Sequence, residues 1–170
     1  MIIEFFRREL KKEDMSETKQ MLFARNLICA CVESDNNADY QGLIYHQYAD
    51  APIAFDGMTD FMMKLEDLFD EWDFPQRGLA PRAFKKGSRD DIGYKKKKLP
   101  DKLPIEIISE TNGVRNVQNK KGKLGTFVIQ VVYRQDASWQ GHVIYQEKNE
   151  KMDFVSALEL IKIMDRALKA

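Results

Sequence analysis

The chain has 170 residues, of which 44% are hydrophobic and 32% are charged, and its formal net charge is zero. This composition is typical of a globular protein with one compact domain or two small lobes that share a core. No apolar run reaches the roughly 18–20 residues of a membrane-spanning helix, and the N-terminal residues lack the pattern of a signal peptide. These features argue against a membrane-spanning class and favour a cytoplasmic protein with no membrane partner.

Charge is unevenly distributed along the chain. Residues 50–81 carry eight acidic and two basic side chains, whereas residues 82–123 carry thirteen basic and five acidic ones. Such asymmetry can steer an acidic partner towards one side of a protein, or favour head-to-tail association of two copies. A homodimer is therefore one expectation, but the charge pattern does not identify a partner.

The N-terminal part of the chain predicts a helical arm and then a strand. Ile3, Phe6 and Leu10 recur at helical spacing within residues 1–20, which favours a short helix or arm. Residues 22–32 are largely apolar and contain Ile28, Ala30 and Val32 in alternation, which predicts a strand.

A returning strand and a helix complete this first unit. Residues 34–37 form a turn cluster, and residues 40–48 predict the second strand of a hairpin. Asp56 is placed to cap a helix that runs to about Trp72. The apolar stripe of this helix is expected to be buried and contains Met58, Phe61, Met62, Leu65, Phe69 and Trp72.

The middle of the chain differs in composition from both ends. Residues 74–123 contain four of the five prolines and the lysine run 95–98, which predicts a basic loop over about 85–102. Residues 105–108 and 114–118, separated by a Thr-Asn-Gly turn, predict a small hairpin.

The C-terminal part repeats the plan of the first unit. Residues 127–132 and 139–146 predict two strands, and Asp153 is placed to cap a helix over residues 155–168. The positions expected to be buried in this helix include Leu158, Ile161 and Leu168.

The two ends align with each other at a constant offset of 99 residues. Residues 27–69 match residues 126–168 without a gap, with six identities in 43 positions and with apolar positions in phase. We therefore predict an α+β fold in which two ββα repeats form an antiparallel sheet covered by helices. The single domain, 1–170, then comprises the following parts: repeat 1 (about 22–73), a basic Pro-containing insert (about 74–123) and repeat 2 (about 124–170).

An aromatic-Gln-Gly motif recurs at equivalent positions of the two units. A glycine inside a strand permits a bulge or a close backbone approach, so one interpretation is purely structural. The other is a quasi-symmetric binding surface for a protein or small ligand. Its candidate residues are Tyr40, Gln41, Trp139 and Gln140, together with the nearby charged residues Arg134 and Asp136.

The basic segment 82–123 supports an alternative function. Lys95, Lys96, Lys97 and Lys98 could neutralise phosphates, and the neighbouring Tyr94 could stack on a base. A nucleic-acid-binding protein is therefore the second hypothesis, although a lysine run in such a loop is most often simply solvated.

The chain contains no recognisable catalytic or cofactor motif. Cys29 and Cys31 lie two apart in a predicted strand and are interpreted as packed thiols, because no further ligand pair completes a zinc site. An enzyme or metal protein built around His46 or His142 is the third hypothesis. The leading expectation is a non-catalytic binding or regulatory module without cofactor or metal.

The C-terminal unit carries a distinctive pattern, Tyr-Arg-Gln-x-x-Ser-Trp-Gln-Gly over residues 133–141, followed by Phe-x-Ser-x-Leu-Glu-Leu over 154–160. This pattern resembles a group of small uncharacterised bacterial proteins found in anaerobic gut bacteria. The resemblance implies no activity, cofactor or ligand. Val155 stands where that pattern is expected to have an arginine.

Overall fold

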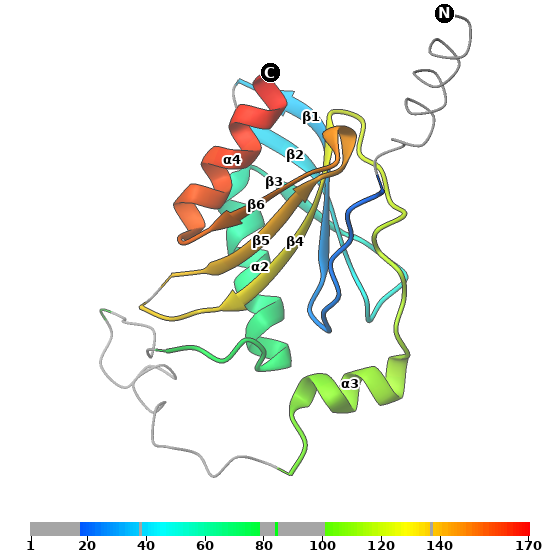
Figure 1. Cartoon of the computed structure of the whole chain (residues 1–170). Coiled ribbons are helices and arrows are strands. Elements are labelled where there is room, and N and C mark those ends of the chain that lie inside the picture. Colours follow the sequence, from blue (N-terminus) through cyan, green and yellow to red (C-terminus); the bar gives the residue numbers. More distant parts are fainter. Residues whose placement is uncertain (1–17, 38, 79–83, 85–100, 137) are drawn as a thin grey trace, which may run out of the picture.

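The computed structural model describes residues 18–37, 39–78, 84, 101–136 and 138–170. It confirms an α+β fold with a six-stranded antiparallel sheet (Figure 1). The strands are β1 (Ile28–Asn36), β2 (Asp39–His46), β3 (Ile53–Asp56), β4 (Gly125–Tyr133), β5 (Gln140–Tyr145) and β6 (Glu150–Phe154). The helices are α2 (Met58–Trp72), α3 (Pro104–Asn112), the 3-10 helix η1 (Gln146–Lys148) and α4 (Ala157–Lys169). Within the described part of the chain, no helix is long and apolar enough to cross a membrane.

The strands follow the order β3-β2-β1-β4-β5-β6, so β1 and β4 lie side by side at the centre of the sheet. Cys29 is opposite Val128, which is 99 residues further along the chain. The flanking pairs are Ala30 with Phe127 and Ile28 with Ile129, so the residue 99 positions after each β1 member lies in the other flanking pair. In this register, residues that are 99 positions apart take equivalent places in the two halves of the sheet, β3-β2-β1 and β4-β5-β6.

Each hairpin contains a β-bulge at an equivalent position. The register shifts between Val32 and Ser34 in the β1–β2 pair, and between Val131 and Tyr133 in the β4–β5 pair. Gly141 lies beside this irregularity, where an added Cβ would come within 1.9 Å of the Gln130 carbonyl oxygen. The glycine of the repeated motif is therefore required by the close approach of two backbones.

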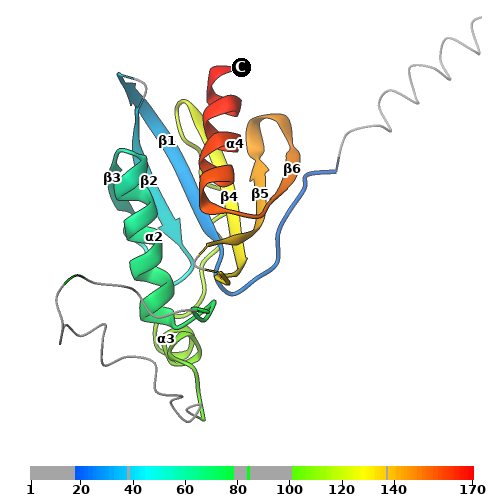
Figure 2. The same ribbon diagram turned by 90° about the vertical axis from the view of Figure 1, so that its left-hand side faces the viewer.

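The sheet is covered on both faces. Helices α2 and α4 pack on one face over a large apolar core that includes Phe61, Leu65, Leu160 and Met164 (Figure 2). A smaller core on the opposite face contains Cys29 and Cys31 beneath the segments that lead into β1 and β4. Its buried members are Leu22, Leu27, Cys29, Cys31, Val117, Val128 and Ile144.

The helix starts differ from those expected. Asp39, on β2, accepts a hydrogen bond from the Met58 backbone N–H at 2.9 Å, so it rather than Asp56 supplies the side-chain acceptor at the start of α2. Ser156 is the N-cap of α4 and accepts from the Glu159 N–H at 3.0 Å, in place of the expected Asp153. Both expected aspartates instead lie in or at the end of short strands, which the sequence pattern did not reveal.

Several other sequence expectations are corrected by the structure. A third strand, β3 or β6, follows each hairpin before the helix begins. Residues 105–108 belong to α3 rather than to a strand, with Pro104 at its first position, where the missing N–H costs no helical hydrogen bond. Leu158 is 60% exposed, and the buried positions of α4 are Leu160 and Met164.

We expect Gly141→Ala to lower the free energy of unfolding by about 3 kcal/mol, because the new methyl group would force two paired backbones apart. Urea unfolding of the variant measures this loss. Gly113→Ala is the matched control, since its Cβ would meet no atom within 4 Å and only its φ of 73° opposes alanine. That control should cost about 1 kcal/mol. Equal losses in the two variants would contradict the steric explanation.

Candidate functional site

The aromatic residues of the repeated motif are buried and each contacts a helix of the opposite half. The Tyr40 hydroxyl donates a hydrogen bond to Asp165 Oδ1 on α4 at 2.8 Å. The Trp139 indole N–H donates to Glu66 Oε1 on α2. Burial, and then the hydrogen bond to Asp165, raise the pKa of Tyr40 to about 12. Tyr40 and Trp139 therefore connect the sheet to its helices and do not form an exposed aromatic surface.

The two glutamines of the motif are hydrogen-bonded beside the bulges. Gln41 accepts from the Ser34 hydroxyl at 2.9 Å and donates to Asp56 Oδ1 at 2.8 Å. Gln140 donates to the Gln135 carbonyl at 3.2 Å and accepts from the Gln135 N–H at 3.3 Å. Each glutamine thus satisfies polar groups near the end of its own hairpin.

Arg134 is a buried charge at the end of β4, with a side chain only 3% exposed. Its Nε donates to the Pro75 carbonyl at 2.6 Å, and its Nη1 donates to Glu66 Oε2 at 3.0 Å and to Asp70 Oδ1 at 2.7 Å. Arg77 also pairs with Asp70. Burial alone would raise the pKa of Asp70, but hydrogen bonds from the two arginines outweigh burial and lower it.

The predicted site residues therefore separate into two groups. Glu66 brings Arg134 and Trp139 together, because its two carboxylate oxygens bind one residue each. Tyr40 and Gln41 lie in the other half of the sheet, and Asp136 is exposed in the β4–β5 connection with a positive φ of 54°. Lys95–Lys98 of the nucleic-acid hypothesis lie outside the described residues.

A groove of about 390 Å³ opens beside Trp139 between α2 and the start of α4; we call it the Trp139 groove. Met63 is 63% exposed there, and Asp67 makes no hydrogen bond or ion pair within the described part of the chain. The lining residues are Met62, Met63, Glu66, Asp67, Asp70, Arg77, Ser138, Trp139 and Ala157. The sequence analysis did not predict this groove, although two adjacent methionines between acidic residues were a usable signal.

Ala157 contributes only a small side chain to the lining of the Trp139 groove. The residue 99 positions earlier is Met58, which is buried at the start of α2 and belongs to the core cluster that also contains Tyr40. At both sites a side chain at or just before the second strand of the hairpin accepts from the first helical N–H: Asp39 for Met58 and Ser138 for Ala157. The backbone arrangement is thus equivalent, and replacement of methionine by alanine leaves unfilled space next to the indole.

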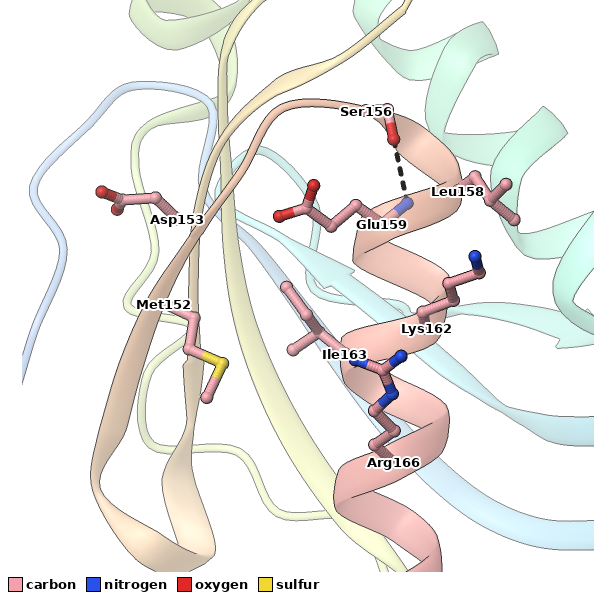
Figure 3. Close-up of a pocket in the computed structure, with 8 residues that line it drawn as sticks. All are labelled: Met152, Asp153, Ser156, Leu158, Glu159, Lys162, Ile163 and Arg166. Atoms are coloured by element: carbon pink, nitrogen blue, oxygen red, sulfur yellow. Dashed lines mark hydrogen bonds between the residues drawn. The ribbon is translucent and has the colours of Figure 1, made fainter.

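A second opening lies between the edge strand β6 and α4; we call it the β6–α4 groove (Figure 3). Met152 on the strand and Ile163 on the helix point into this groove, whereas the Asp153 carboxylate points away from the helix. This part has a volume of about 620 Å³. It continues past Met152, Ile163 and Arg166 into a more enclosed section of about 250 Å³. That section is also lined by Val143, Tyr145, Lys148, Glu150, Ala167 and Ala170.

The histidines and cysteines do not converge on one site. His46 contacts the Trp72 ring edge-on at 5.4 Å between centroids, whereas His142 pairs with Asp153 at 2.5 Å on the opposite face of the sheet. The thiols of Cys29 and Cys31 are buried and unbridged, with sulfur atoms 3.9 Å apart. Among the described residues, no group of three or more metal-ligating side chains gathers.

We expect Arg134→Gln to lower the free energy of unfolding by about 3–5 kcal/mol, because it leaves two carboxylates near α2 without their buried partner. Arg77→Gln is the matched control: its side chain is 27% exposed, and we expect a loss of about 1 kcal/mol or less. Chemical denaturation of both variants measures the difference. Similar losses would show that the burial of Arg134 is not what makes it important.

His46 should make stability depend on pH. Burial, and then the charge of Arg115, lower the pKa of His46 in the folded state. The unfolded chain therefore binds the proton more readily, and stability falls as pH drops below about 6.5. We expect the loss in unfolding free energy between about pH 7.5 and 5.5 to be smaller in His46→Gln than in the unaltered chain. The same pH slope in both proteins would contradict this assignment.

Comparison with known proteins gives no match: no family model, no curated protein and no solved structure matches the chain. The function is therefore argued from the geometry of the two grooves.

Proposed function

We propose that the protein is an internally duplicated, non-catalytic binding module whose Trp139 groove recognises an apolar, basic segment of a partner protein. Two ββα-type units, joined by an insert, would each supply three strands and one helix. The observation that carries the binding proposal is the open space lined by Trp139 and Ala157, where Ala157 stands at the position that the buried Met58 has in the other half.

The equivalent bulges and the central register support the duplication. Residues 99 positions apart have matching pairing partners in β1–β2 and β4–β5. The same holds for β2–β3 and β5–β6, where Gly42 pairs with Phe55 and Gly141 with Phe154. Unrelated segments would have no reason to share a bulge, a glycine and an aromatic cross-strand partner at one constant offset. The same repetition accounts for the aromatic-Gln-Gly motif as a structural feature of each hairpin. We therefore place the binding surface next to the motif and not on the motif itself.

The lining of the groove favours an apolar and cationic ligand. Met62 and Met63 are flexible, polarizable side chains that adapt to different apolar partners. Asp67 is exposed and unpaired among the described residues, whereas Glu66 and Asp70 are held by Arg134 and Arg77. A leucine-like side chain could therefore enter beside Trp139 while a lysine or arginine of the same segment pairs with Asp67.

The size of the groove suits a few side chains of a partner. Its volume of about 390 Å³ lies in the lower part of the range of ligand sites, roughly 300–1,000 Å³. The ion pairs at its base fix the positions of the indole and of two carboxylates before binding, which lowers the entropic cost of association. No acid-base or nucleophilic pair is needed for this role.

The test uses two short synthetic peptides, one composed of leucine and lysine and the other of leucine and glutamate. Nuclear magnetic resonance of the methionine methyl groups reports where each peptide binds. We expect the lysine peptide to shift the Met62 and Met63 signals and the glutamate peptide to leave them unchanged. Asp67→Lys should weaken binding of the lysine peptide about tenfold, through lost attraction and new repulsion.

Two variants provide the controls. Ala157→Met should fill the groove and abolish the methyl shifts, whereas Glu71→Lys changes an exposed carboxylate of the same helix outside the groove and should leave affinity within about twofold. Unchanged Met62 and Met63 signals with the lysine peptide, or equal effects of the two charge reversals, would count against this function.

A further inference from the structure

We propose that residues 1–17 dock into the enclosed section of the β6–α4 groove of their own chain, where they take the place that α3 takes beside α2. This site is separate from the Trp139 groove. The inference uses the duplication that forms part of the proposed function, but it does not depend on any partner peptide.

The β6–α4 groove lies where α4 lacks two side chains that fill or bridge the equivalent space between β3 and α2. At the other edge of the sheet, Lys64 on α2 donates to the Ala54 carbonyl of β3 at 2.6 Å and to Asp60 at 2.9 Å. The residue of α4 that corresponds to Lys64 is Ile163, which cannot bridge helix and strand in this way. Similarly, Leu68 is buried in the first half, and Ala167 stands at its place in α4.

The segment that precedes β4 shows how such a place is covered. Helix α3 packs against α2 and buries Ile105 completely in the main core. The chain then crosses to the β2–β3 connection, where the Arg115 N–H donates to the Gln47 carbonyl at 2.8 Å and Asn112 donates to the Tyr48 carbonyl at 3.3 Å. The lead-in to a central strand thus covers the helix of the opposite half.

The segment that precedes β1 makes the equivalent crossing. Gln20 donates from its backbone to Asn149 Oδ1 at 2.7 Å and from its side chain to the Asn149 carbonyl at 2.8 Å, and Asn149 donates to the Thr18 carbonyl at 3.2 Å. Asn149 lies between Lys148 and Glu150, which both line the enclosed section. The chain therefore meets the described structure at Thr18, at the mouth of this section.

Length and sequence of residues 1–17 fit this site. Ile3, Phe6 and Leu10 recur at helical spacing, and in the sequence residues 5–13 stand 99 positions before α3. The residues between Phe6 and Thr18 can span about 40 Å when extended, more than the length of β6, about 17 Å. The enclosed section of about 250 Å³ is also large enough for one aromatic ring, since a cavity of about 150 Å³ binds benzene.

The test places a benzophenone amino acid at Phe6 of the full chain and irradiates the monomer at low concentration. Mass spectrometry then locates the crosslink. We expect attachment within the chain to β6 or α4, at Met152 or at neighbouring groove residues. Ala167→Leu, which restores the side chain found at the corresponding position of α2, should reduce that crosslink at least about fivefold by filling the section.

Ala157→Met is the matched control, because it fills the Trp139 groove and should leave the crosslink unchanged. The two alanine variants also separate the proposals: failure of peptide binding at the Trp139 groove leaves the crosslink result intact, and the reverse holds as well. Crosslinks to residues outside the β6–α4 groove, no crosslink, or a crosslink only between two copies of the chain would each overturn docking within one chain.

Discussion

The antiparallel pairing of β1 with β4 is the contact on which the rest of the molecule depends. Its residues are almost wholly buried, with Ile28, Ala30 and Val32 facing the helices and Cys29 and Cys31 facing the lead-in segments. A three-stranded unit with one helix has little core of its own. Joining two such units edge to edge gives a continuous sheet wide enough to bury α2 and α4 on one face. The small core on the other face then holds the lead-in segments in place.

This central pairing also explains why the polar contacts of the aromatic motif cross between halves. Tyr40 reaches Asp165, and Trp139 reaches Glu66, so each hairpin is bound to the helix of the other half. Asp165 and Glu66 are themselves 99 positions apart. A buried hydroxyl or indole N–H requires an acceptor, and here each acceptor lies on the element that most needs to be fixed to the sheet. Arg134 extends the second of these contacts to Asp70 and Pro75, which joins the end of α2 to the end of β4.

The sequence was sufficient to predict the α+β class, the hairpins and both helices that flank the sheet, because strand alternation and helical stripes are local signals. It was insufficient for β3 and β6, since strands of four or five residues are too short for alternation to stand out. The strand expected at residues 105–108 became a helix because Pro104 starts α3 and Ile105 is drawn into the core. Burial of Arg134 could not be predicted either: it follows from Glu66 and Asp70, which are distant in sequence and adjacent only after folding.

Both grooves lie where the two halves of the sheet differ in side-chain size at positions 99 residues apart. A scaffold that is closed in one half becomes open in the other when Met58 corresponds to Ala157, or Leu68 to Ala167, while the backbone stays in register. Lost side-chain volume that the backbone cannot collapse to fill remains as accessible surface. An apolar face left in this state is unfavourable in water, so it is retained at a cost in stability unless something covers it. The β6–α4 groove lies next to Thr18, which adjoins the N-terminal residues, whereas the Trp139 groove combines methionines with Asp67, which has no ion-pair partner among the described residues. Position and charge thus distinguish the two grooves, and the two proposals rest on this difference.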